Sequence, residues 1–254
     1  MRYLLVLLIM LLTACGGGGQ AVAPIGKYSK STKAKVSQTK APSVYKVKKG
    51  DTLYSISWRY GMDYKTLAKI NTIRSPYKIF VGQKIVFKST RKYQQTVKKK
   101  TTASKKKTTS KKATTNKVVK KPTVSTRPSN QSISWRWPTK GKVISSYSKT
   151  AAGRKGINIS GKSGQEIVSA AAGKVVYSGN GLVRYGNLLI IKHNDTYLSA
   201  YAHNKQLLVK DGQYVKAGQK IATLGRTGTQ RDQLHFEIRR NGKPIDPMQF
   251  LPKR

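Results

Sequence analysis

Two long stretches rich in Lys, Thr and Ser limit most strongly what this chain can fold into. Residues 16–43 begin with four Gly and continue in small and polar residues, and residues 89–131 contain two runs of three Lys. Such segments bury too little apolar surface to form a core, and like charges keep the second one extended. The sequence therefore predicts a flexible tether over 15–43, a disordered basic linker over 89–131, and folded modules over 44–88 and 132–254.

The charge balance is extreme, with 51 Lys and Arg against 8 Asp and Glu for a formal net charge of +43. No acidic residue occurs from Tyr64 to Gln165. Such a balance indicates an anionic partner, for which nucleic acid is the usual candidate. The linker is either a solvated spacer or a basic arm that adheres to anionic envelope polymers, such as peptidoglycan peptides or lipopolysaccharide phosphates.

The N-terminus indicates the compartment. Arg2 precedes an uncharged apolar run over 4–12, which is too short to span a bilayer and is typical of a signal-peptide core. Residues 12–15 read Leu-Thr-Ala-Cys, which resembles the lipobox of bacterial lipoproteins. This resemblance implies that the signal peptide 1–14 is removed and that Cys15 becomes the lipidated first residue. The alternative is an uncleaved anchor with an incidental Cys.

Cys15 is the only Cys in the chain, so the sequence offers no disulfide framework and no Cys-based zinc site. Gly16 rather than Asp follows it, which in enteric-type bacteria implies sorting to the outer membrane. We therefore expect an outer-membrane lipoprotein that faces the periplasm and is held to the membrane by the lipid on Cys15, with the inner membrane as the alternative. A secreted lipoprotein does not meet chromosomal DNA, so we expect no nucleic acid as a partner.

The module at 44–88 predicts a small α+β fold of strand, helix, helix and strand (βααβ). Alternating residues predict a strand at each end of the module. Between the strands, apolar residues at three- and four-residue spacing predict a first helix that Asp51 or Thr52 caps. Asp63 suits the N-cap of a second helix, which ends near Asn71.

This module resembles the LysM domain, through Gly-Asp-Thr-Leu at 50–53, Tyr-Gly at 60–61 and Val-Gly-Gln-Lys-Ile at 81–85. The resemblance implies binding of glycans that contain N-acetylglucosamine, here peptidoglycan. In such domains the sugar lies between the first strand–helix loop and the last helix–strand loop. The glycan contacts that this implies are Gly50, Asp51, Thr52, Leu53 and the segment from Ile73 to Ile79. The alternative role of residues 50–52 is to shape the turn, and the two roles are compatible.

From Trp135 onward Lys becomes sparser and acidic residues return. Short apolar runs, such as 188–191 and 235–238, alternate with turns that contain Gly or Asn, and no helical period persists. The sequence therefore predicts an all-β domain of short antiparallel strands over 132–254, long enough to form its own core.

Four segments of the C-terminal module are informative: Gly-Ile-Asn-Ile at 156–159, Tyr-Ala-His at 201–203, Val-Lys-Ala-Gly-Gln-Lys-Ile-Ala at 215–222 and Leu-His-Phe-Glu at 234–237. Through these segments the module resembles the LytM-type, lysostaphin-like zinc endopeptidases. These segments occur in the family's order and extend through most of the domain. The resemblance implies the lysostaphin-type fold over this module.

The positions that hold and serve zinc in this family are largely replaced here. Arg154 and Asn158 stand where the family has a His and an Asp ligand, and only the third ligand position, His235, is intact. A guanidinium cannot ligate a cation, and a neutral amide is a poor ligand beside a carboxylate. Of the two further His positions, His203 is kept and Gln233, which cannot carry a proton, replaces the other. The chain is therefore predicted to be a non-catalytic member of the family without a cofactor.

The sequence leaves two alternatives to this interpretation open. A metal could be bound by the three His residues of the chain, which are His193, His203 and His235. An active zinc endopeptidase with such a rebuilt site would cleave peptidoglycan peptide cross-links by itself. A purely structural tether between outer membrane and cell wall would use the lipid, the LysM-like module and the basic linker, but it leaves the C-terminal domain without a task.

The order lipobox, LysM, linker and degenerate LytM domain resembles the NlpD-like lipoproteins among the LytM-domain amidase activators. The resemblance implies that the emptied groove binds the inhibitory helix of a periplasmic N-acetylmuramyl-L-alanine amidase and so opens the amidase's own zinc site during cell separation. Arg154 is the first candidate for pairing with an acidic group of that partner. The candidate groove residues are Arg154, Asn158, Tyr177, Tyr185, Tyr201, His203, Gln233 and His235, and for each Tyr ordinary strand packing is the alternative.

Overall fold

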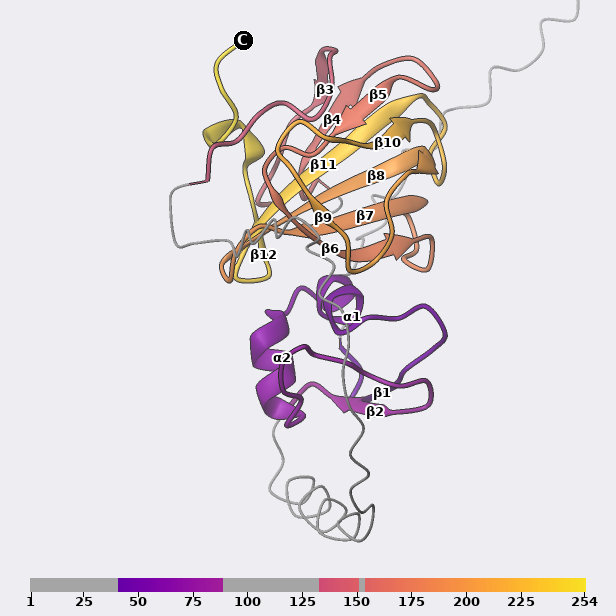
Figure 1. The fold of residues 1–254 in the computed structure, drawn as a ribbon, viewed down its shortest axis with the longest axis vertical. Helices are drawn as coiled ribbons and strands as arrows, with labels where there is room; N and C mark the ends of the chain where they lie inside the picture. Colours follow the sequence, from indigo (N-terminus) through magenta and orange to yellow (C-terminus); the bar gives the residue numbers. More distant parts are fainter. Residues whose placement is uncertain (1–40, 89–132, 151–153) are drawn as a thin grey trace, which may run out of the picture. The chain divides into compact units, whose positions relative to one another are not determined.

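The computed structural model describes residues 41–88, 133–150 and 154–254 (Figure 1). The predicted signal peptide, Cys15, the basic linker and the part of the first tether before residue 41 lie outside these ranges. Within the described ranges, no helix is long and apolar enough to cross a membrane.

The N-terminal module has the predicted order of elements, which confirms the βααβ fold. It consists of β1 (Val44–Lys46), α1 (Leu53–Tyr60), α2 (Tyr64–Ile70) and β2 (Lys84–Val86). The two strands pair antiparallel, with Val44 opposite Val86. A small core closes between the strands and the helices, and its fully buried members include Leu53, Ile56, Leu67 and Ile85.

Both helices begin at the predicted caps. The Thr52 side chain accepts a hydrogen bond from the Ser55 amide, and the Ser55 hydroxyl accepts one from the Thr52 amide, which completes a capping box. Asp63 accepts in the same way from the Thr66 amide at the start of α2. Gly61 ends α1 at φ 64°, a left-handed conformation that favours Gly.

The C-terminal module is built from strands, which confirms the all-β prediction. Its strands are β3 (Val143–Ser145), β4 (Ile157–Ser160), β5 (Glu166–Val168), β6 (Gly173–Gly179), β7 (Asn187–Lys192), β8 (Tyr197–Leu207), β9 (Tyr214–Val215), β10 (Lys220–Leu224), β11 (Gln233–Arg240) and β12 (Lys243–Ile245). A short 3-10 helix, η1 (Pro247–Gln249), follows them. The main sheet has the order β3-β4-β11-β8-β7-β6-β9, with antiparallel neighbours, while β10 pairs with β5 and β8 and β12 pairs with β11.

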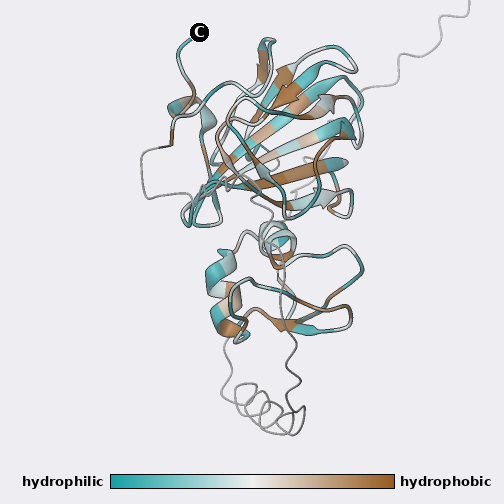
Figure 2. Ribbon diagram, in the orientation of Figure 1, coloured by the Kyte–Doolittle hydropathy of each residue, from teal (hydrophilic) through white to brown (hydrophobic). Residues whose placement is uncertain are grey.

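The interior strand β11 shows how this sheet divides its two faces. Leu234, Phe236 and Ile238 are fully buried in the main core, together with Ile157 and Ile159 of the neighbouring β4. Hydrophobic and hydrophilic residues interleave along the strands of the sheet (Figure 2). Because side chains alternate between the faces of a strand, the polar residues between these apolar ones lie on the opposite face.

Candidate functional site

The candidate site lies on the face of the sheet opposite the main core, where β4, β11 and β8 run side by side (Figure 1). In the strand register His235 of β11 lies opposite Asn158 of β4 on one side and Ala202 of β8 on the other. Strand alternation places Gln233, His235 and Glu237 on this face. We call it the site face.

His235 is held by two side-chain oxygens. Its Nδ1 lies 2.6 Å from Oδ1 of Asn158, and its Nε2 lies 3.2 Å from Oε1 of Glu237. Both ring nitrogens, which are the atoms that could bind a metal, are therefore engaged within the domain. Asn158 thus takes part in an internal hydrogen bond at the position where the endopeptidases would have a ligand.

Glu237 is the centre of the polar network on the site face. Oε1 accepts a hydrogen bond from the Tyr185 hydroxyl at 2.7 Å, and Oε2 accepts one from Nε of Arg239 at 2.9 Å. Burial alone would raise the pKa of the Glu237 carboxyl, but the Arg239 charge and the bonds from His235 and Tyr185 outweigh it and bring this pKa to about 2. The carboxylate is therefore ionised at neutral pH and holds its neighbours in place.

His203 reaches the site face because β8 contains a bulge. Asn187 of β7 pairs with Asn204, whereas Leu189 pairs with Tyr201, so β8 carries an extra residue between these pairs. His203 has φ 66° at this point, and its Nδ1 lies 2.8 Å from the carbonyl oxygen of Thr227. Burial lowers the pKa of His203, and its ring centroid lies 6.0 Å from that of His235.

Gln233 and Arg154 lie at other points of the site. Gln233 donates from Nε2 to Oγ1 of Thr229 at 3.1 Å, which ties the start of β11 to the loop before it. Arg154 is exposed and lies just before β4, where its carbonyl oxygen accepts from the Ser148 amide. Neither residue brings a metal ligand to His235, since neither a guanidinium nor an amide replaces an imidazole in that role.

The three predicted Tyr residues lie in different environments. Tyr185 belongs to the site, through its bond to Glu237 and its edge contact with the His235 ring at 6.0 Å between centroids. Burial and the negative charge of Glu237 raise the pKa of Tyr185. Tyr177 is buried, and its hydroxyl accepts from the Gly181 amide.

Tyr201 lies in the main core and not on the site face, so its placement among the groove contacts is corrected. It is fully buried beside Phe236, and its hydroxyl accepts a hydrogen bond from the Ala170 amide at 2.8 Å. The register of β8 with β11 is the physical reason: Tyr201 lies opposite Phe236, and partners across two strands share a face, so both side chains point into the core. The bulge that follows turns His203 to the site face.

The donors on the site face do not fit a catalytic zinc ion. The described residues contain no group of three or more His, Cys, Asp or Glu side chains arranged to hold a metal. His193, the third member of the alternative His set, is buried elsewhere, with its Nε2 2.7 Å from the Ser199 hydroxyl and its ring against Trp135. The set His193, His203 and His235 is therefore not assembled.

The predicted glycan contacts fall into different environments. The Asp51 carboxylate accepts from the Tyr45 hydroxyl at 2.7 Å and from the Lys48 amide at 2.8 Å, and Arg59 lies 3.7 Å away. Asp51 and Thr52 therefore shape the turn and the helix start. Leu53 is fully buried, Gly50 is exposed with φ 83°, and Ile73 and Ile79 pack partly buried against the small core.

Two residues of the network, Glu237 and Arg239, were absent from the predicted site residues. Both follow His235 at steps of two along β11, so strand alternation from His235 was a signal that could have found them.

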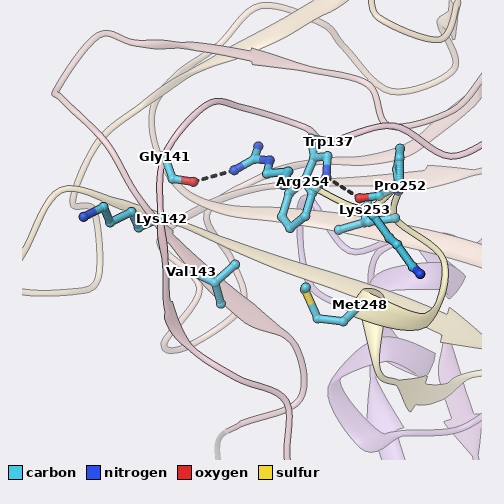
Figure 3. Close-up of a pocket in the computed structure, with 9 residues that line it drawn as sticks. Trp137, Gly141, Lys142, Val143, Met248, Pro252, Lys253 and Arg254 are labelled. Carbon is cyan, nitrogen blue, oxygen red and sulfur yellow. Dashed lines mark hydrogen bonds between the residues drawn. The ribbon is translucent and has the colours of Figure 1, made fainter.

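A separate pocket of about 420 Å³ lies beside η1 and the C-terminal residues (Figure 3). In it the Arg254 guanidinium stacks 3.7 Å from the Trp137 ring centre and donates to carbonyl oxygens of Gly141 and Thr139. None of the predicted site residues lines this pocket, and its lining residues are Trp137, Gly141, Lys142, Val143, Met248, Leu251, Pro252, Lys253 and Arg254.

Comparison with known proteins gives two family matches, a LysM domain over residues 45–88 and peptidase family M23 over residues 152–247. Relatives match nearly the whole chain. The lipoprotein NlpD/LppB homolog of Pseudomonas aeruginosa is 43% identical, with 96% of this chain and 89% of that protein covered. The murein hydrolase activator NlpD of Salmonella typhimurium is 43% identical over 84% of this chain and 69% of its own length.

The murein hydrolase activator NlpD of Escherichia coli is 41% identical, with 91% of this chain and 70% of that protein covered. These identities extend across both modules rather than one of them. The chain therefore belongs to the NlpD family, and it carries a LysM domain followed by a peptidase family M23 domain.

Proposed function

We propose that this protein is a non-catalytic activator of a peptidoglycan hydrolase, and that its direct partner is a periplasmic N-acetylmuramyl-L-alanine amidase. The observation that carries this proposal is the state of His235, whose two ring nitrogens are engaged by Asn158 and Glu237. A hydrolytic zinc site keeps three protein ligands and one open position, and the site face lacks such a set among its described residues.

The names of the relatives support the same proposal, since two of those described are murein hydrolase activators. Activation follows if the site face binds the amidase's inhibitory helix more tightly once that helix has left the amidase's own active site. Binding energy of this kind shifts the amidase toward its open state. The contacts we propose for the helix are Arg154, Asn158, Tyr185, His203, Gln233 and His235.

We further propose that the LysM domain binds peptidoglycan and that a lipid on Cys15 holds the protein at the outer membrane, facing the periplasm. The loop at 50–53 and the segment 73–79 are the proposed glycan contacts, with Gly50 as an exposed backbone position. Such anchoring keeps the site face close to the substrate of the amidase, where it serves cell separation and cell-wall remodelling.

The test is dye release from labelled peptidoglycan sacculi by a soluble form that starts at Gly16, with and without zinc and a purified periplasmic amidase. We expect no release by this protein alone and strong release when the amidase is added. Release by this protein alone that a chelator abolishes would instead identify an endopeptidase. Absence of any effect on the amidase, together with intact binding to sacculi, would favour a structural tether.

A further inference from the structure

The inference drawn here rests on the proposed function and concerns the chemistry of the partner segment. Charged residues from three separate parts of the M23 domain form a cluster. Lys155 precedes β4, Arg184 lies in the loop between β6 and β7, and Arg239 belongs to β11. Within the described ranges, Glu237 is the carboxylate that acts on this cluster, and Arg239 already neutralises it through a 2.9 Å ion pair.

Backbone packing brings these segments together around Glu237. A Cβ on Gly156 would meet the Glu237 side chain at 2.9 Å, so the backbone next to Lys155 lies directly against it. Tyr185, the neighbour of Arg184, donates its hydroxyl to the same carboxylate. Lys155 and Arg184 therefore border one end of the site face.

Burial and the neighbouring charges of the cluster affect the pKa of Lys155. Burial lowers the pKa of the Lys155 ammonium, and the positive charges of Arg239 and Arg184 lower it further, against the opposing effect of Glu237. A half-buried cation beside two others is unfavourable in the free protein. An anionic ligand that settles beside them removes this repulsion, and the free energy gained contributes to binding.

The loop that carries Arg184 also presents an apolar side chain. Val183 is 85% exposed, and Arg184 adopts φ 74°, a left-handed conformation that is uncommon for a residue with a side chain. Backbone strain of this kind persists only where surrounding structure enforces it, and here the next residue is fixed by the Tyr185 bond to Glu237. The loop thus holds one apolar and one cationic side chain in the solvent.

We propose that Lys155, Arg184 and Val183 form the docking end of the site face for an acidic amphipathic segment of the partner amidase. Carboxylates of that segment pair with Lys155 and Arg184, and one of its apolar side chains packs on Val183. Glu237 and Arg239 hold the receptor side in place and remain paired with each other.

The experiment uses the soluble form that starts at Gly16, the purified amidase and labelled sacculi. The double variant Lys155→Glu with Arg184→Glu is compared with a matched control, Lys162→Glu with Lys216→Glu, which changes exposed Lys residues elsewhere in the domain and has the same net charge. We expect the first to raise the half-maximal concentration for activation about tenfold or more, and the control to leave it within about twofold. Arg184→Lys, which keeps the charge, should retain activation.

Ionic strength separates the charged contacts from the apolar one. Activation by the wild type should weaken at high salt, and the double Glu variant should have lost most of this dependence. Val183→Ser should weaken activation while leaving its salt dependence unchanged. Thermal unfolding of each variant verifies that the domain is folded.

The outcomes distinguish this inference from the function on which it rests. If the wild type does not activate the amidase, the proposed function fails. If the wild type activates and the double Glu variant activates equally well, only the docking end is wrong. If the double variant instead loses binding to sacculi without amidase present, the anionic ligand is peptidoglycan and the proposal is overturned.

Discussion

At the scale of single residues, His193 is the His that serves the fold rather than the site face. Its Nδ1 lies 2.8 Å from the Ala172 carbonyl oxygen and its Nε2 2.7 Å from the Ser199 hydroxyl. Full burial lowers the pKa of His193 to about 4, from an ordinary value near 6.5. The unfolded chain therefore takes up a proton between these pH values while the folded domain does not.

This difference predicts that the M23 domain loses stability as the pH falls from about 6.5 to about 4. The free energy of unfolding should decrease by up to about 1.4 kcal/mol per pH unit from this residue alone. Urea unfolding followed by Trp fluorescence would measure it, since Trp135 packs on the His193 ring. His193→Gln should be less stable at neutral pH but show a shallower slope, and equal slopes for both proteins would contradict the assignment.

At the scale of elements, Asn71 joins the end of α2 to β2 in the LysM domain. Its Nδ2 donates to the carbonyl oxygens of Leu67 and Val86, and its Oδ1 accepts from the Val86 amide, each at 2.8 Å. The Asn71 side chain is buried, and the sequence pattern indicated only that a helix ends there. This residue therefore fixes the position of a helix against a sheet that has only two strands.

Asn71→Ala should destabilise the LysM domain by about 2 kcal/mol or more, because it leaves buried polar groups of Val86 unpaired. A domain this small has little stability to lose. We expect weaker binding to sacculi in a sedimentation assay, with no loss of stability in the M23 domain. Lys69→Ala, an exposed change on the same helix, is the matched control. Unchanged unfolding of the LysM domain in Asn71→Ala would refute the role assigned to Asn71.

Elements were predictable from sequence where local rules act, as in the caps at Thr52 and Asp63 and the alternation along β11. The site was less predictable where strand pairing departs from regular register. Tyr201 and His203 are two apart and by alternation should share a face. Tyr201 follows the register into the core opposite Phe236, but the bulge turns His203 to the site face. A bulge is decided by partner strands far along the chain, so a local pattern does not reveal it.

At the scale of the whole molecule, the chain combines a LysM domain with an M23 domain, to which the proposed function gives the cell wall and the amidase as separate partners. Binding through LysM raises the local concentration of the M23 domain at the wall, and this effect requires no contact between the two domains. Under the proposed function, the maximum of activation depends in contrast on the site face alone. The concentration for half-maximal activation and the maximal rate can therefore be changed separately.

Deleting residues 44–88 should raise the concentration for half-maximal amidase activation on sacculi by about 100-fold while leaving the maximal rate nearly unchanged. Dye release measured over a range of protein concentrations would show this. Asn71→Ala in the otherwise intact soluble chain should shift the curve in the same direction, and Lys69→Ala should not. A lower maximum after the deletion, with the M23 domain still folded, would mean that LysM takes part in activation itself and not only in anchoring.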